Sequence, residues 1–142
     1  MITVRKAKTL ADFIDAVRLR TQVFIVEQGF APGWEPDDDD KTATQFIAAE
    51  GTKVVGTCRM RQERPHEFKI ERMAVAKEWR KHGVGKLLAK AALKQALKLK
   101  PKRVWIRCQL KSQKFWESCG FKVKTKPYQA WGRTHIDLDY PF

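Results

Sequence analysis

The chain has 142 residues, of which 43% are hydrophobic and 32% are charged, and its formal net charge is +13. This length predicts a single domain over residues 1–142. No apolar run approaches the ~20 residues of a membrane span, and the first residues lack the apolar core of a secretory signal, which excludes a helical membrane protein. Three cysteines without zinc spacing argue against a disulfide framework or a metal site and predict a cytoplasmic protein.

The spacing of apolar residues and the positions of turn-forming residues predict the helices and strands of the chain. Thr9 followed by Asp12 has the pattern of a helix cap, Gly51 suits the turn of a hairpin, and Gly120 suits the end of a short helix. In chain order we expect a strand over 2–6, a helix after Thr9, a loop over 29–41, strands over 45–50, 53–62 and 68–75, a helix over 84–99, a strand over 103–108, a short helix over 112–119, and strands over 121–128 and 134–140. Adjacent strand pairs predict a mixed α/β fold with a partly antiparallel sheet.

The positive charge is concentrated in residues 77–126, which hold 16 Lys and Arg residues against two Glu residues. Part of it follows helical spacing, opposite an apolar face that includes Leu87; the lysines are Lys86, Lys90, Lys94 and Lys98. Such a face could bind an acidic partner, for example RNA or an anionic surface. A solvated outer face explains the same pattern, and we favour it because no aromatic-basic RNA motif is visible.

A basic turn between the strand over 68–75 and the long helix is the most informative local motif. It reads Arg80-Lys-His-Gly-Val-Gly85. Two glycines let the backbone approach an anion closely, and the N–H groups of a helix N-terminus point toward it. The spacing is neither the dinucleotide fingerprint nor a P-loop. The motif predicts a phosphate cradle.

This turn resembles the acetyl-CoA pyrophosphate loop of the GNAT (GCN5-related) N-acetyltransferases. Residues 55–60 and 71–75 are similar to the third and fourth strands of that family, and residues 113–121 to its second cofactor-side helix. Residues 20–29 and 132–136, with three acidic residues between them (Glu35, Asp37 and Asp40), resemble a small bacterial group whose substrates are poorly defined. The resemblance implies a GNAT fold, with a mostly antiparallel sheet flanked by helices and a fourth and fifth strand that splay apart.

The resemblance also implies a reaction, the direct transfer of an acetyl group from acetyl-CoA to a primary amine on a small molecule or peptide. A non-catalytic acyl-CoA-binding module is the alternative, and a homodimer is compatible with either. Carried over residue by residue, the cofactor site comprises Met73, Ala74, Val75, Arg80, Lys81, His82, Gly83, Val84, Gly85, Lys86, Gln113, Phe115 and Trp116. The residues on the strand would bind pantetheine through their main chain.

Glu71 is the candidate general base, because it lies on the strand beside the expected thioester. An ion pair with Arg59, Arg61 or Arg72 is the competing interpretation. Trp116 stands where many GNAT enzymes have a tyrosine acid, and an indole N–H donates a hydrogen bond but no proton. Cys119, one helical turn later, could supply that proton, as could Tyr128 or water.

The amine acceptor is expected to meet acidic and polar side chains. Glu27 and Gln28 lie in the matched stretch, and the run Asp37 to Asp40 could draw a cation to the mouth of the site or be an ordinary polar loop. His135 could face the acceptor or could be a structural histidine of the sheet. Acceptor specificity is expected in the loops over 29–41 and 128–133.

Overall fold

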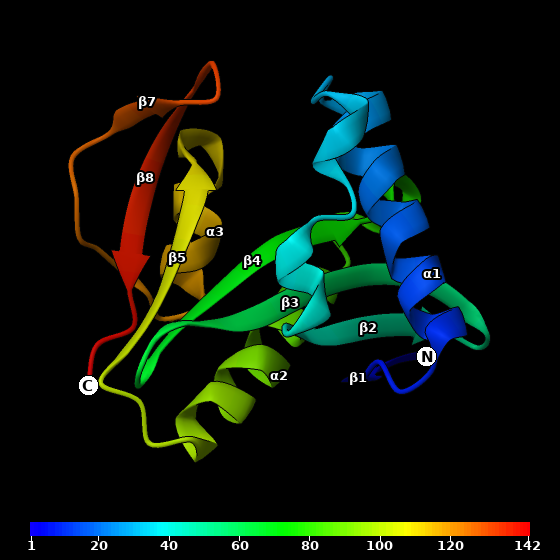
Figure 1. Cartoon of the computed structure of the whole chain (residues 1–142), viewed down its shortest axis with the longest axis horizontal. Helices are drawn as coiled ribbons and strands as arrows, with labels where there is room; N and C mark the ends of the chain where they lie inside the picture. Colours follow the sequence, from blue (N-terminus) through cyan, green and yellow to red (C-terminus); the bar gives the residue numbers. More distant parts are fainter.

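The computed structural model describes all residues from Met1 to Phe142. One sheet runs through the molecule in the order β1-β2-β3-β4-β5-β8-β6, with β7 paired to β8 (Figure 1). Its strands are β1 (Ile2–Lys6), β2 (Thr44–Glu50), β3 (Lys53–Arg64), β4 (Glu67–Val75), β5 (Arg103–Gln109), β6 (Lys122–Val123), β7 (Tyr128–Ala130) and β8 (Arg133–Asp139); the helices are α1 (Leu10–Arg20), α2 (Val84–Lys98) and α3 (Gln113–Ser118). Every strand pair is antiparallel except β4 and β5. The expected mostly antiparallel sheet flanked by helices is confirmed.

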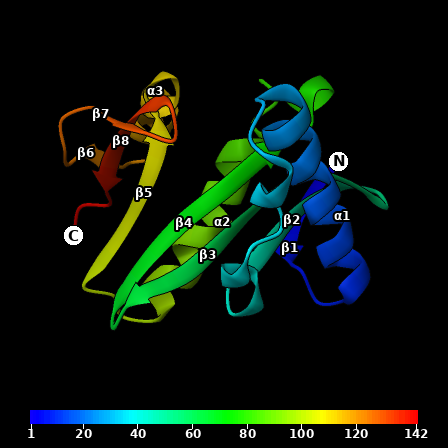
Figure 2. The ribbon, with the colours of Figure 1, turned by 45° about the horizontal axis from the view of Figure 1, so that its top comes forward.

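The parallel pair β4 and β5 separates halfway along its length. Pairing runs from Glu67 opposite Arg103 to Ile70 opposite Ile106, and no ladder continues beyond that point. Figure 2 shows the two strands meeting at one end and diverging toward the other. The register of β4 against β3 also shifts there, and Arg72 has a left-handed φ of 54°, as in a β-bulge. The predicted splay of the fourth and fifth strands is confirmed.

Helices cover opposite faces of the sheet. The main core lies under α2 and includes the line Val84, Leu88, Ala92 and Ala96, together with Trp116 from α3. A smaller cluster of Leu19, Val23 and Ala74 lies under α1 and its continuation. Because successive strand residues alternate between faces, β2 to β4 can supply both clusters.

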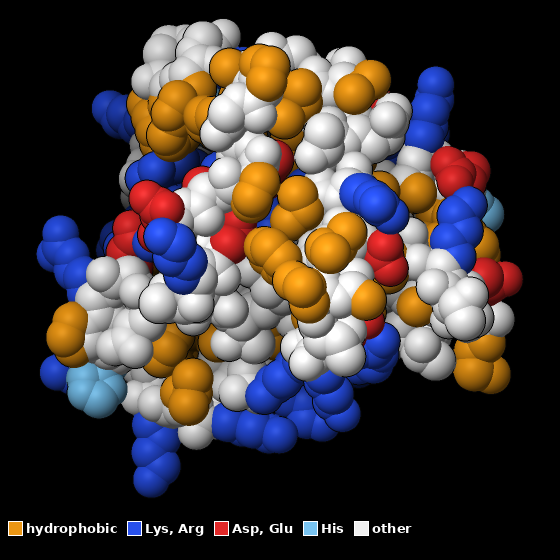
Figure 3. Space-filling model, turned by 45° about the vertical axis from the view of Figure 1, so that its right-hand side comes forward, with side chains coloured by type: hydrophobic (Ala, Val, Ile, Leu, Met, Phe, Trp, Pro, Cys, Tyr) orange, Lys and Arg blue, Asp and Glu red, His pale blue; other side chains and the backbone are white.

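Helix α1 begins as its sequence predicts, because Thr9 Oγ1 accepts the N–H of Asp12 at 3.1 Å. It continues into a π-helical segment, Thr21–Glu27. On its outer side Leu10 is 72% exposed and Ile14 is 41% exposed. Figure 3, which views this side of the molecule, shows hydrophobic side chains gathered near the centre of the face with charged side chains around them.

Two local predictions are wrong. Residues 121–128 form two short strands rather than one, because Pro127 has no N–H to donate and Thr125 uses its hydroxyl to accept the N–H of Asp137. Leu87 is 44% exposed rather than buried, because the sheet contacts only the narrow line of α2 given above. The four lysines of the predicted stripe are exposed and form no ion pair. No helix in the chain is long and apolar enough to cross a membrane.

Candidate active site

The turn before α2 leaves unpaired main-chain donors at the helix N-terminus. Lys81 and Gly83 both have left-handed φ values, 66° and 80°, so the chain turns sharply into the helix. Gly83 is the N-cap and supplies no side-chain acceptor, which leaves the first N–H groups of α2 without a partner from the chain. Unpaired N–H groups at the positive end of a helix dipole form an anion site.

Arg80 fastens this turn to the sheet. Its Nε donates to the carbonyl of Val75 at 3.0 Å, and its terminal nitrogen lies 2.7 Å from Glu27 Oε2. The Nε and one terminal nitrogen of Arg80 therefore already have partners within the chain. Glu27, expected at the mouth of the acceptor site, pairs with Arg80 and does not line the main cavity.

Residues predicted to bind the cofactor meet where β4, α2 and α3 converge. A Cβ built on Gly85 would lie 3.0 Å from the ring of Phe115 and 3.5 Å from Met73 Sδ, so only glycine fits here without displacing its neighbours. Val84 and Ala74 are 1% and 2% exposed, so their side chains belong to the core.

A cavity of about 430 Å³ runs through the fork between β4 and β5. Its lining includes six of the predicted site residues: Gln28, Glu71, Met73, Phe115, Trp116 and His135. Glu27, Arg80 and Cys119 are not part of the lining. Side chains from both faces of the sheet meet in this cavity, so two substrates can reach the fork from opposite sides.

Glu71 lies on the cavity wall but is held by cations. Its carboxylate accepts from Arg59 Nε at 2.8 Å, Arg61 Nε at 2.9 Å and Lys69 Nζ at 3.0 Å. Burial alone would raise the pKa of Glu71, yet Lys69, Arg59 and Arg61 together lower the pKa to about 2. A carboxylate this acidic is a weak base, and these contacts favour the ion-pair interpretation.

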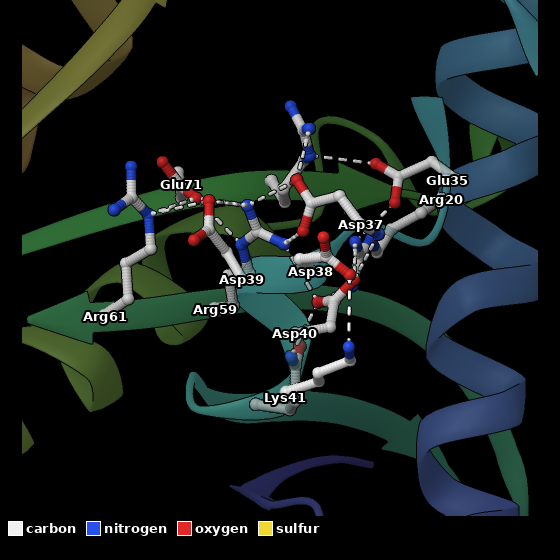
Figure 4. A network of polar contacts seen from close by, with 12 residues as sticks. Arg20, Glu35, Asp37, Asp38, Asp39, Asp40, Lys41, Arg59, Arg61 and Glu71 are labelled. Atoms are coloured by element: carbon white, nitrogen blue, oxygen red, sulfur yellow. Dashed lines mark hydrogen bonds and ion pairs between the residues drawn. The ribbon is translucent and has the colours of Figure 1, made fainter. Parts of the chain in front are cut away.

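The aspartate run belongs to the same ionic network (Figure 4). Asp37 lies 2.6 Å from Arg59, and Asp40 pairs with both Arg59 at 2.9 Å and Arg20 at 2.8 Å. Arg20 also pairs with Glu35, and both side chains are fully buried. The network fastens the loop over 29–41 to α1, β3 and β4. Asp37 and Asp40 are thus counter-ions of arginines rather than an open acidic mouth.

None of the three candidate acids presents a free acidic proton to the cavity. Trp116 is 5% exposed and packs edge-on between Phe115 and Phe121. Cys119 is half-buried outside the cavity, and burial raises the pKa of its thiol. Tyr128 donates its hydroxyl to Asp137, and burial followed by that hydrogen bond raises its pKa to about 12.

Aromatic side chains form the wall of the cavity on the side where the acceptor is expected. Phe30 stacks on Trp34 at 4.5 Å, Trp34 meets Trp131 edge-on at 5.8 Å, and Trp131 lies 5.3 Å from His135. The two loops expected to set specificity supply three of these rings. Arg107 on β5 also lines the cavity. Local patterns did not single out these rings or Arg107, because an isolated Trp or strand Arg carries no motif.

Comparisons with known proteins agree with this geometry. Residues 13–121 match the profile of the Acetyltransferase (GNAT) family. The Bacillus subtilis (strain 168) protein YyaT is 27% identical over 139 residues, which cover 95% of this chain and 93% of YyaT. YjcF, an uncharacterized N-acetyltransferase of the same organism, is 28% identical over 133 residues, covering 93% of this chain and 94% of YjcF.

The solved structure of Escherichia coli ElaA has the same fold. It superposes with a TM-score of 0.88 at 25% identity, over 99% of this chain and all of ElaA. The matched residues include most of α1, all of β4, the turn before α2, and β5. They therefore cover the two strands that form the fork. The chain therefore belongs to the GNAT family of acetyltransferases, which use acetyl-CoA as the acetyl donor.

Proposed function

We propose that this chain, acting as one domain over residues 1–142, transfers the acetyl group of acetyl-CoA directly to a primary amine. The observation that carries the proposal is the fork between β4 and β5, with an anion cradle beside it and a cavity running through it. Because two substrates can meet at the fork from opposite faces of the sheet, the amine can attack the thioester without a covalent enzyme intermediate.

The cofactor lies along the open part of β4 in this proposal. Beyond Ile70 the edge of β4 that faces β5 has no strand partner, so the main chain of residues 73–75 is free to bind pantetheine as an added strand. The turn over 80–86 receives the pyrophosphate, with Lys81, His82 and Lys86 exposed around it. Phe115 and Trp116 close the opposite side from α3, and Gln113 lies at the start of the same helix.

His135 is the proton acceptor in this proposal. Its Nδ1 lies 3.0 Å from the carbonyl of Arg133, and a carbonyl can only accept, so Nδ1 carries the proton and Nε2 of the neutral ring is basic. His135 lines the cavity, whereas Glu71 is occupied by three cations. Glu71 acts as their counter-ion.

In this proposal, cations and main-chain N–H groups near the fork stabilise the departing thiolate of CoA. The thiolate then takes its proton from solvent. Trp116 offers at most a hydrogen bond. Cys119 keeps its proton because its pKa is raised, but it lies outside the cavity. Neither side chain is assigned as the acid.

Acceptor, partners and location are finer parts of the proposal. We assign the lysine face of α2 as a solvated surface. If the protein has an acidic macromolecular partner, this face is where it would bind.

A homodimer would bury Leu10 and Ile14, the exposed apolar residues of α1. Light scattering measures the mass in solution and tests this. Three free cysteines suit a reducing cytoplasm.

The proposal is tested by calorimetry with acetyl-CoA and by release of CoA thiol in the presence of amines. Gly83→Asp places a carboxylate in the cradle, and Gly83→Asn is the matched neutral control with the same shape. Both types tolerate a left-handed φ better than other residues. We expect the Asp variant to bind acetyl-CoA at least ~10-fold more weakly than the Asn variant. Equal affinity in two folded variants contradicts the assigned cradle.

A further inference from the structure

Arg107 is a cation of the acceptor side whose terminal nitrogens have no carboxylate partner. It lies on β5 one residue beyond the last pair with β4, at the fork itself. Only its Nε reaches a carboxylate, at 3.3 Å from Asp137 Oδ1. That oxygen already accepts the hydroxyl of Tyr128. The two terminal nitrogens of a cavity-lining guanidinium are left for a ligand.

The guanidinium of Arg107 is held in position by aromatic rings. It lies 5.3 Å from the ring of Trp105, 5.8 Å from that of Tyr128 and 5.6 Å from that of Trp131. Cation–π contacts of this kind orient a planar guanidinium without using its hydrogen-bond donors. Arg107 is therefore pre-organised for a planar anion.

The other buried cations of the cavity already have counter-ions. Arg59 and Arg61 share Glu71, Lys69 lies 3.0 Å from the same carboxylate, and Arg72 pairs with Glu35 and Asp37. Burial lowers the pKa of Lys69, and the positive charge of Arg107 contributes to that shift. Among the arginines that line the cavity, Arg107 is thus the one whose terminal nitrogens have no carboxylate partner.

Trp131 is held over the cavity at a cost in backbone strain. Its φ is 51°, and a bulky residue rarely adopts this left-handed conformation. Figure 1 shows the hairpin of β7 and β8 on the β5 side of the fork, across from β4. Strain of this kind persists at sites where the position of the side chain is used. Trp131, Trp34 and Phe30 together form an aromatic wall of the cavity, with Phe30 stacked on Trp34 and Trp131 edge-on to Trp34.

We infer that the acceptor is a primary amine that carries a carboxylate and an aromatic or large apolar side chain, as an aromatic α-amino acid does. The inference rests on the proposed function and names its substrate class. One free planar guanidinium matches one planar carboxylate through two parallel hydrogen bonds. A phosphate dianion would need a second free buried cation, which the cavity lacks.

The positions of the two polar residues suit such a molecule. In the β5–β8 register Arg107 faces Asp137, and Gln109 faces His135. His135 and Arg107 are therefore diagonal neighbours on one face of the sheet, with Cα atoms about 7–8 Å apart. The carboxylate binds Arg107 while the adjacent amine points toward His135.

The chemical step balances without a further reactant. The ammonium group gives one proton to His135, and its nitrogen lone pair attacks the thioester carbon. The C–S bond then breaks, and CoA leaves with the electron pair of that bond. The nitrogen gives its second proton to solvent, His135 returns the first proton to solvent, and solvent protonates the thiolate. The products are an N-acetyl amino acid, CoA and one released proton.

The test compares L-phenylalanine with phenethylamine, which lacks only the carboxylate. We expect the parent protein to show a kcat/KM at least ~10-fold higher for L-phenylalanine. Arg107→Gln should abolish this preference by lowering kcat/KM for L-phenylalanine and leaving that for phenethylamine within about 3-fold. Arg103→Gln is the matched control, because Arg103 also stacks on Trp105, at 4.5 Å, but pairs with Asp139 and does not line the cavity.

A binding measurement keeps the inference testable if turnover is slow. Calorimetry with N-acetyl-L-phenylalanine and CoA-loaded protein should show binding that Arg107→Gln weakens at least ~10-fold and Arg103→Gln leaves unchanged. Equal use of both amines by the parent, a preference retained in Arg107→Gln, or no binding of this product overturns the inference. In each of those cases the proposed function stands if acetyl-CoA is bound and some other amine is acetylated. Failure to bind acetyl-CoA overturns both.

Discussion

The two sides of the β4–β5 fork differ in the kinds of groups that form them. The proposed cofactor side consists of main chain and small or apolar residues: an unpaired strand edge, a left-handed turn and a glycine packed on Phe115. The proposed acceptor side consists of charged and aromatic side chains from segments far apart in the sequence. A main-chain site depends on local conformation, whereas a side-chain site depends on how distant segments meet. The acceptor side should therefore be more sensitive to single substitutions.

The largest effect is expected at Arg59, which holds the loop over 29–41 on the sheet. Its side chain is 1% exposed, and Arg59→Met would leave Asp37, Asp40 and Glu71 without a shared cation. Removing one partner of a buried pair costs about 3–5 kcal/mol, so the free energy of unfolding should fall by that amount in urea titrations. Arg64→Met on the same strand is the control, because Arg64 is exposed and unpaired. Similar losses in both variants would contradict the role of the network.

The second prediction separates the roles of Glu71 and His135. Glu71→Gln should lower stability by about 2–3 kcal/mol, through lost charged hydrogen bonds, and leave turnover of the folded protein within about 5-fold. His135→Gln should lower kcat by ~10²–10⁴-fold, as expected for a general base, with acetyl-CoA affinity unchanged. Steady-state kinetics and calorimetry on both variants decide. The reverse outcome would restore Glu71 as the base.

Acid should destabilise the folded protein through the ionic network of Arg59, Glu71 and Asp37. The folded-state pKa of Glu71 is about 2, and Arg59 and Arg72 hold that of Asp37 below its usual value despite burial. In the unfolded chain these groups titrate near ~4. Their stabilising contribution is present above that pH and is lost as the pH falls toward about 2. Melting temperatures between pH 6 and 2.5 should decline steeply in the parent and less steeply in Arg59→Met; parallel curves would contradict this origin.

The smallest effect is expected on the cofactor side, at Cys119. Because its thiol lies outside the cavity, Cys119→Ala should leave kcat within about 2-fold and acetyl-CoA affinity unchanged. Thiol-release kinetics across pH measure this. A drop of more than 10-fold in kcat with intact affinity would identify the thiol as the proton donor and correct our assignment to solvent.

Local sequence determined the elements whose causes are local. The Thr9 cap, the Gly51 hairpin, the Gly120 helix end and the turn before α2 depend on neighbouring residues only, and the structure has each of them. Residues 121–128 have the apolar pattern of one strand, but Pro127 has no N–H to donate and the strand is interrupted. The fork was expected only through the family resemblance, since no local pattern marks where two strands separate.

Tertiary structure alone decided the ionic network and the acceptor wall. Asp37 and Asp40 look like a solvated loop in the sequence, and only folding brings them to Arg59, which is 19 to 22 residues away. The same holds for Trp34 and Trp131, which come from opposite ends of the chain and meet at 5.8 Å. The sequence by itself determined most helices, strands and turns, including the turn before α2, because backbone conformation and apolar spacing depend on neighbouring residues. Which side chains face the acceptor depended on long-range packing, which no local pattern encodes.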